Sequence, residues 1–229
     1  MKVSVIVAAA GSGTRMGGVR KPYLMLDGMP VLVRSLKLFM NHPEVVEIIA
    51  VIRPGEEGEA SALLKPYREM DNVRLVPGGS TRQESVREGL RALSEPCDLV
   101  CIHDAARPLA SEALLEVLLE SAVRRGAAVP VLPVTDTVKE IDSEEKIVAT
   151  PERDRLCLVQ TPQVFRRELI LKAYKEAGPA LLTATDDSSL VERIGGDVYT
   201  VPGEDTNIKL TSPLDLKMAA WLLKGALNR

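Results

Sequence analysis

Short apolar runs alternate with amphipathic segments along most of the chain. The apolar runs, rich in valine and isoleucine, lie at residues 2–9, 45–52, 73–77, 98–103 and 127–132. Runs of this length and composition are typical of buried strands. Helical periodicity predicts helices over 30–40, 56–70, 81–93, 111–126, 166–176 and 187–194, and in a last segment that follows residue 211.

Local signals mark where several of these helices begin. Thr81 and Glu84 have the spacing of a capping box, and Ser111 is a candidate N-cap for the segment 111–126. The last helix should begin with Ser212 as its N-cap and Pro213 at its first position. Its apolar side chains, which we expect to be buried, are Leu214, Met218, Trp221 and Leu222.

The alternation of strands with helices predicts the fold class. Right-handed βαβ units give an α/β, Rossmann-like fold in which helices cover both faces of a mostly parallel, twisted sheet. In such sheets ligands bind outside the carboxyl ends of the strands. The stretches 11–22, 77–83 and 103–108 each follow a predicted strand, so these three loops should meet on one edge of the sheet.

The rhythm changes after Pro133. Residues 134–141 and 146–150 have the pattern of two strands around the acidic turn 142–145. This hairpin is too polar for the centre of a sheet and too isolated to be stable alone. We interpret residues 134–158 as an arm that projects from a single domain and packs against a second copy of the chain. A flexible surface hairpin is the alternative.

Composition narrows the class of protein. The chain has 229 residues, of which 45% are hydrophobic and 27% charged, and its net charge is −3. These values fit one globular domain and give no reason to expect a nucleic-acid partner. The three cysteines form no CxxC motif, and reduced thiols suit the cytoplasm. Since Met1-Lys2 leads directly into the first strand and no apolar run is long enough to span a bilayer, neither export nor a membrane is expected.

The loop after the first strand is the main candidate for chemistry. Residues 11–22 contain four glycines together with Arg15, Arg20 and Lys21. Glycine lets backbone N–H groups approach an anion such as phosphate. The loop is not a P-loop, and Met16 stands where a dinucleotide-binding fingerprint needs glycine. The pattern therefore indicates an enzyme that holds a triphosphate, or else a glycine-rich turn with solvated basic residues.

Other loops offer further candidates. Asp104 ends an apolar strand and is a candidate for binding magnesium or a sugar hydroxyl, although an N-cap role is an alternative. Ser80, after Gly78-Gly79, could contact a nucleobase or ribose, or could cap a helix. We interpret His103 as structural because no acidic or nucleophilic partner lies near it in sequence.

Several motifs together indicate a family. The segment 8–16 followed by Lys21-Pro22 resembles the signature of nucleotidyltransferases. The further motifs are Gly78-Gly79-Ser80-Thr81-Arg82-Gln83, His103-Asp104-Ala105-Ala106-Arg107-Pro108, Asp136-Thr137-Val138-Lys139, Gln160-Thr161-Pro162-Gln163, Thr185-Asp186-Asp187 and Asn207-Ile208-Lys209. From residue 3 to about residue 220, the ordered set resembles the 2-C-methyl-D-erythritol 4-phosphate cytidylyltransferases of the non-mevalonate isoprenoid pathway.

The resemblance implies a nucleotidyltransferase fold and a reaction between CTP and methylerythritol phosphate, with Mg²⁺ as cofactor. Arg15 and Lys21 would stabilise the pentavalent transition state. The residues that it assigns to the CTP site are Ala9, Ala10, Gly11, Gly79, Ser80, Ser85, Asp104 and Ala105, with the metal near Asp104. The residues that it assigns to the acceptor are Arg153, Lys209, Thr137, Arg107 and Thr185. In this family the arm is exchanged in a homodimer, so Thr137 and Arg153 would serve the partner's site.

Two positions depart from the family pattern. Arg20-Lys21-Pro22 stands where the family usually has proline, lysine and glutamine, which leaves open whether Arg20 or Lys21 faces the phosphate. Ser80 stands where an acidic residue is common. A sister cytidylyltransferase acting on ribitol 5-phosphate and a non-catalytic nucleotide-binding module remain as rival interpretations.

Overall fold

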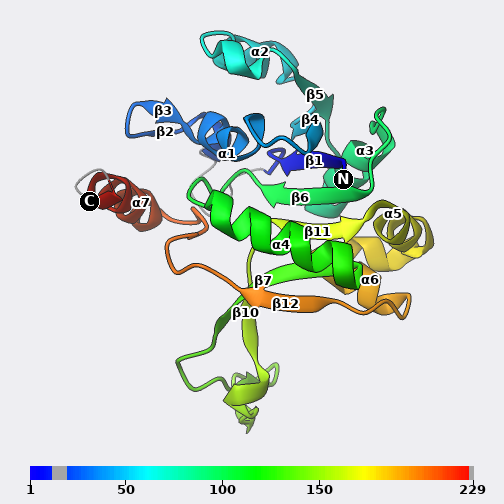
Figure 1. The fold of residues 1–229 in the computed structure, drawn as a ribbon. Coiled ribbons are helices and arrows are strands. Elements are labelled where there is room, and N and C mark those ends of the chain that lie inside the picture. Colours follow the sequence, from blue (N-terminus) through cyan, green and yellow to red (C-terminus); the bar gives the residue numbers. More distant parts are fainter. Residues whose placement is uncertain (12–19, 227–229) are drawn as a thin grey trace.

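A parallel, four-stranded unit forms the centre of the molecule. The computed structural model describes residues 1–11 and 20–226 (Figure 1). Its central strands run in the order β5, β4, β1, β6, and all neighbours are parallel. Their bounds are β1 (Val3–Ala8), β4 (Val45–Ile52), β5 (Val73–Pro77) and β6 (Leu99–Asp104). Each corresponds to an apolar run in the sequence, so these strand predictions are confirmed.

The other half of the sheet is mixed. Strand β11 (Gln163–Arg166) lies antiparallel between β6 and β7 (Ala127–Pro133). Strand β10 (Cys157–Val159) pairs antiparallel with the end of β7, and β12 (Tyr199–Pro202) pairs parallel with β7. Three antiparallel pairings thus join four parallel ones, which agrees with the prediction of a mostly parallel sheet.

Helices cover both faces of this sheet, as predicted. Helices α1 (Val31–Met40), α2 (Glu57–Leu64) and α4 (Glu112–Arg125) pack on one face. Helices α3 (Arg82–Arg91), α5 (Arg167–Glu176) and α6 (Ser188–Arg193) pack on the other. Because successive strand side chains point to opposite faces, Val5 and Val7 belong to the first core and Ile6 to the second.

The helix boundaries follow the local signals in most places. Thr81 and Glu84 form the expected capping box, and the Ser111 side chain accepts a hydrogen bond at the start of α4. Helix α2 is shorter than the predicted span 56–70. It ends at Leu64, and a 3-10 turn, η3 (Arg68–Met70), follows. Pro66 explains the early end, because proline has no backbone N–H to donate the next helical hydrogen bond.

The last helix, α7 (Pro213–Ala226), corrects one prediction. Leu214, Met218 and Trp221 were expected to be buried, yet they are 63%, 47% and 70% exposed. Leu222 is half-buried. The side that is buried carries Ala219 instead. This helix packs beside the small hairpin of β2 (Met25–Leu26) and β3 (Met29–Pro30) rather than across the sheet (Figure 1). Helical periodicity identified an apolar stripe but could not say that it would lack a covering element.

Of the predicted arm, residues 134–158, the part up to residue 156 projects away from the sheet between β7 and β10 (Figure 1), whereas Cys157 and Leu158 belong to β10 and pair with β7. The projecting part contains the expected hairpin, but its strands β8 (Glu140–Ile141) and β9 (Ile147–Ala149) are shorter than predicted. The turn η4 (Arg153–Arg155) follows. Within the described ranges, we find no helix with the length and hydrophobicity needed to cross a membrane.

Candidate active site

A cavity of about 920 Å³ lies at the carboxyl edge of the parallel strands. Its walls are the segments that follow β1, β4, β5 and β6, which confirms that the loops meet there. The described residues that line it are Ala8, Ala9, Ala10, Gly11, Lys21, Pro22, Arg53, Pro54, Gly78, Gly79, Ser80, Thr81, Arg82, Ser85, Asp104, Ala105, Ala106 and Lys209. The cavity therefore combines small residues with four cationic side chains.

Lys21 and Arg20 differ in what they face. Lys21 lines the cavity. The Arg20 guanidinium instead donates to Glu59, with Nη2 at 2.8 Å from Oε1, and lies 3.6 Å from a Glu56 oxygen. Arg20 also stacks over the Tyr23 ring at 4.8 Å. The structure thus assigns the cavity-facing position to Lys21. Arg15 lies outside the described residues.

The wall formed by Gly78–Ser85 is tightly packed. A side chain on Gly78 would come within 2.6 Å of the Ser85 hydroxyl, and one on Gly79 would collide with Glu84. The Glu84 carboxylate accepts hydrogen bonds from the backbone N–H of Ser80 at 2.9 Å and from the Ser80 hydroxyl. These bonds hold the pKa of Glu84 below its ordinary value. Since Thr81 is the N-cap of α3, Ser80 does not cap that helix.

Asp104 is held between two cations. Arg82 Nε donates to Oδ1 at 2.8 Å, and Lys209 Nζ donates to Oδ2 at 2.6 Å. Burial by itself raises the pKa of Asp104, but Arg82 and Lys209 outweigh it and hold the pKa well below its ordinary value. Asp104 is therefore a carboxylate at any physiological pH, and it does not act as an N-cap through either oxygen.

Lys209 reaches Asp104 from a segment more than a hundred residues away in the chain. Backbone and side-chain hydrogen bonds fix this segment. Asn207 Nδ2 donates to the carbonyl of Thr161 at 2.9 Å, and the Leu210 N–H donates to the carbonyl of Ala106 at 2.8 Å. Gln160 Nε2 donates to the carbonyl of Glu204 at 2.9 Å. Gln160 and Thr161, which follow β10, thus anchor the strip that carries Lys209.

His103 is part of the structural framework behind the cavity. It is fully buried, with Nε2 3.0 Å from the Arg107 carbonyl and Nδ1 3.1 Å from the Thr161 hydroxyl. The carbonyl can only accept, so Nε2 carries the proton and Nδ1 accepts from Thr161. Burial lowers the pKa of His103 to about 4, which keeps the ring neutral. This agrees with the structural interpretation.

Four predicted acceptor-binding residues do not appear among the described residues that line the cavity. Thr137 and Arg153 lie on the arm, where Arg153 Nη1 donates to the carbonyl of Thr135 at 2.9 Å. Thr185 is exposed before α6. Arg107 Nη1 donates to the carbonyl of Asn207 at 2.7 Å, so this guanidinium braces the segment of Lys209.

Toward a magnesium ion, the described residues of the cavity offer a carboxylate whose two oxygens also accept hydrogen bonds from Arg82 and Lys209. Asp104 is the one carboxylate among the described residues that line it, and no group of three potential metal ligands occurs in the described part of the chain. Magnesium commonly uses one or two carboxylates plus substrate phosphates. Asp104 would be the protein ligand, and the other ligands would come from the substrate and water.

Sequence reasoning missed two cations of the cavity. Arg53 directly follows β4, so the rule that ligands bind beyond strand ends could have found it. Arg82 is the first residue of α3, and no local pattern reveals that it reaches Asp104. Its partners lie far away in the chain.

The fold and the cavity define the class of protein. A glycine-bordered, cation-lined cavity at the carboxyl edge of an α/β sheet, with one firmly held carboxylate, is the site of a nucleotidyltransferase. The sequence model of the 2-C-methyl-D-erythritol 4-phosphate cytidylyltransferase (IspD) family matches residues 3–225. The chain belongs to this family.

Individual proteins with this activity in their names are similar to this chain over nearly its whole length. The 2-C-methyl-D-erythritol 4-phosphate cytidylyltransferase of Alkaliphilus metalliredigens is 42% identical over 224 residues, which cover 97% of this chain and 93% of that protein. That of Syntrophus aciditrophicus is 43% identical, with coverages of 97% and 96%. The crystal structure of 4-diphosphocytidyl-2C-methyl-D-erythritol synthase from Anaerococcus prevotii matches with a TM-score of 0.85 at 36% identity, covering 97% and 96% of the two chains.

Proposed function

We propose that the chain transfers CMP from CTP to 2-C-methyl-D-erythritol 4-phosphate, giving 4-diphosphocytidyl-2-C-methyl-D-erythritol and pyrophosphate, in isoprenoid precursor synthesis. Family membership supports this reaction. The observation that carries it is the cavity in which Lys21, Lys209 and the paired Asp104 converge beside the glycine-bordered loops. It offers local positive charge in a protein whose net charge is −3.

The proposed reaction is an in-line displacement at phosphorus. A phosphate oxygen of the acceptor forms a bond to the α-phosphorus of CTP, and the bond from that phosphorus to the bridging oxygen of pyrophosphate breaks. Because the nucleophile is already an anion, no covalent intermediate with the protein is needed. Lys21 is assigned to the charge that develops on the α-phosphate. Arg15, outside the described residues, is proposed to share this role.

The remaining cavity residues are assigned to CTP. Backbone groups of Ala9, Ala10, Gly11, Gly79 and Ala105 and the hydroxyls of Ser80 and Ser85 would hold the nucleotide. Asp104 is proposed to hold Mg²⁺, which supplies neutralisation of phosphate charge when bound. Lys209 is assigned to the acceptor phosphate, with Thr185 nearby in the assembled site. Arg107 is assigned to holding the Lys209 segment in place.

We further propose that the arm, residues 134–158, joins two copies of the chain. Its support is the exposure of Ile141, Ile147 and Val148, which are 57–61% accessible on a projecting segment. An isolated hairpin is marginal in water, so apolar side chains on it favour a packing partner. In such a homodimer Thr137 and Arg153 would complete the partner's site.

We also assign the protein to the cytoplasm. Cys97, Cys101 and Cys157 are free, although Cys157 is exposed. Free thiols suit a reducing compartment.

A pyrophosphate-release assay tests the reaction. The protein with Mg²⁺ is mixed with CTP, ATP, GTP or UTP and with methylerythritol phosphate or ribitol 5-phosphate. We expect release with CTP and methylerythritol phosphate to exceed every other combination. Greater release with ribitol phosphate would identify the sister activity instead. Nucleotide binding without release from any pair would indicate a non-catalytic module.

A mixed-subunit experiment tests the arm. Lys21→Ala and Arg153→Ala chains, each inactive alone, are unfolded together and refolded. If Arg153 serves the partner, each mixed dimer has one intact site, and about a quarter of wild-type activity should return by random pairing. If Arg153 serves its own chain, no activity returns. Scattering measurements of the dimer before and after Ile147→Asp provide the independent check.

A further inference from the structure

Arg82 lies in the cavity wall, but its hydrogen bonds direct it toward the protein. Its side chain leaves the first turn of α3, and Nε donates to Asp104 at 2.8 Å. Nη2 donates to Asp187 Oδ2, also at 2.8 Å. The third nitrogen, Nη1, is buried with no hydrogen-bond partner among the described residues. Two of its three nitrogens thus donate to protein carboxylates.

Two further buried residues, Asp187 and Tyr174, hold Arg82 in place. Asp187 is fully buried before α6, and its Oδ1 accepts a hydrogen bond of 2.5 Å from the hydroxyl of Tyr174 on α5. Tyr174 is 7% exposed. The chain Tyr174–Asp187–Arg82–Asp104 therefore runs from the helical layer to the cavity. Its two carboxylates balance the charges of Arg82 and Lys209.

We infer that Arg82 is a positioning residue, which fixes the Asp104 carboxylate so that CTP and its metal meet it in one orientation. The inference rests on the proposed function. Lys209 alone could pull Asp104 toward itself, because a lysine ammonium is a mobile point charge on a flexible stem. The planar guanidinium of Arg82, held by Asp187, opposes that movement. Partners that orient a ligand group typically contribute about 10- to 100-fold to affinity.

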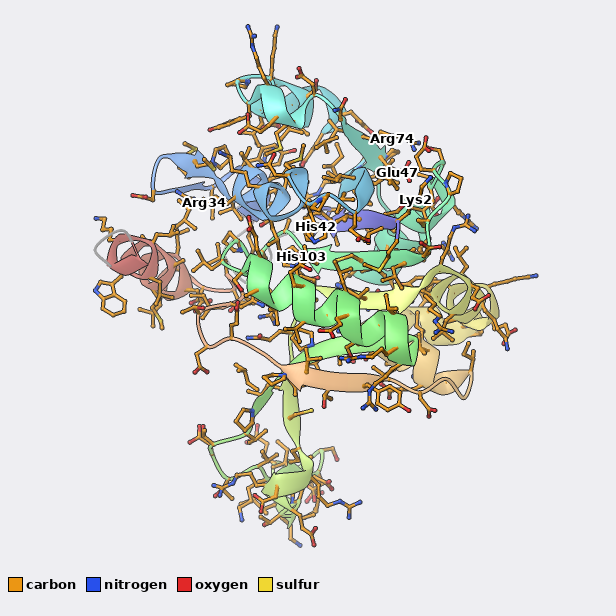
Figure 2. The ribbon with its side chains drawn as sticks, viewed as in Figure 1. Lys2, Arg34, His42, Glu47, Arg74 and His103 are labelled. Carbon is orange, nitrogen blue, oxygen red and sulfur yellow. The ribbon has the colours of Figure 1, made fainter. Side chains whose placement is uncertain are left out.

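Three substitutions test this role. Arg82→Lys keeps the charge but cannot span both carboxylates. Asp187→Asn keeps Arg82 and weakens its support, and Tyr174→Phe removes only the outermost hydrogen bond. The matched controls are Arg74→Lys and Glu47→Gln, which alter another arginine–carboxylate pair, one with a buried carboxylate and an N–O distance of 2.5 Å. That pair lies near the opposite end of the sheet, as Figure 2 shows.

The measurement is the dissociation constant of CTP with Mg²⁺ by titration calorimetry, together with the melting temperature of each variant. We expect Arg82→Lys and Asp187→Asn to weaken CTP binding about tenfold. Tyr174→Phe should weaken it by about threefold, and the two controls by less than about twofold even where they lower the melting temperature. If Arg82→Lys does not fold, the other two variants carry the test.

The outcomes separate this inference from the proposed function. Wild-type binding of CTP with no greater loss in Asp187→Asn than in Glu47→Gln would overturn the positioning role alone. A wild-type protein that bound no CTP would overturn the proposed function, and this role with it. A loss of CTP binding that is larger in Arg82→Lys and Asp187→Asn than in Tyr174→Phe and both controls would support it.

Discussion

Two buried carboxylates, each paired with an arginine, stand at opposite ends of the same sheet, and they have different surroundings. Glu47 on β4 accepts hydrogen bonds from Arg74 Nη1 at 2.5 Å and from the Ser94 hydroxyl at 2.7 Å. The Ser94 backbone N–H and the Ser4 hydroxyl complete its shell. In Figure 2, Glu47 and Arg74 lie together near the start of β1, whereas His103, beside Asp104, lies toward the other end.

The comparison shows that a buried carboxylate with an arginine partner does not by itself identify a functional site. Both carboxylates have lowered pKa values against the opposing effect of burial. Glu47 achieves this chiefly through Ser94, in a closed shell of neutral groups and one arginine. Asp104 has two cations and faces a cavity of about 920 Å³. Asp104 therefore differs from Glu47 because it borders an open cavity whose cationic side chains can bind an anion.

Of all the changes predicted here, removing a cationic side chain from the cavity should have the largest effect, and this effect is on turnover. Lys21→Ala should lower turnover at least about a hundredfold, because it removes a charge that stabilises the transition state. Arg20→Ala, the neighbouring cation paired with Glu59, should change turnover by less than roughly threefold. Steady-state kinetics on both variants, with circular dichroism to confirm folding, measures the contrast. Equal losses would mean that the cavity does not separate functional from surface cations.

Lowering the pH should reduce the stability of the folded protein, because His103 is buried as a neutral ring. The pKa of this ring is lowered to about 4 in the folded protein, whereas an unfolded histidine has a pKa of about 6.5. Between these values the unfolded chain binds a proton that the folded chain does not. The free energy of unfolding should therefore fall by about 2 kcal/mol from pH 6.5 to pH 5. Urea unfolding across this range measures the slope, which His103→Gln should flatten.

Helix α3 connects the two clusters. It begins at Arg82, and the carbonyl of its C-cap residue, Ala92, accepts a hydrogen bond of 2.9 Å from Arg74 Nη1. A methyl group on Gly89 would lie 2.7 Å from Ile6 and 3.0 Å from Val51. Gly89→Ala should cost about 1–2 kcal/mol of stability and displace both clusters. In contrast, Gly58→Ala on α2 meets open space and should stabilise by about 0.5–1 kcal/mol. Thermal unfolding of the Gly89→Ala and Gly58→Ala variants, compared with the wild-type protein, measures both changes in stability.

The smallest effect is expected far from both clusters, on α7. Trp221 is 70% exposed, so Trp221→Ala should change the free energy of unfolding by less than about 0.5 kcal/mol. A buried tryptophan would cost about 3–5 kcal/mol. Urea unfolding followed by circular dichroism distinguishes the two. Iodide quenching of the wild-type fluorescence provides a second check, because Trp221 is the single tryptophan.

The strands and the cavity edge could be predicted because they depend on local composition and on one rule of topology. Runs such as 45–52 can only be buried strands in an α/β pattern, and parallel strands bring their carboxyl ends together. The role of Arg82 could not be predicted in this way. Its partners Asp104 and Asp187 lie 22 and 105 residues away, and only the packing of α6 beside α5 brings the second one near.

Two further results required the structure for other reasons. Arg20 and Lys21 are adjacent cations. The hydrogen bond from Arg20 to Glu59 on α2 holds Arg20 away from the cavity, and Lys21 lines it. The apolar stripe of α7 has ordinary helical spacing, and only the position of its neighbours shows that Trp221 is uncovered.

The root of the arm has a mechanical consequence. Gln160 and Thr161, where the arm returns to the sheet, are tied by hydrogen bonds to the strip 204–207, and Lys209 is two residues further on. The place of the Lys209 ammonium group beside Asp104 therefore depends on the same residues that bring the arm back to the sheet.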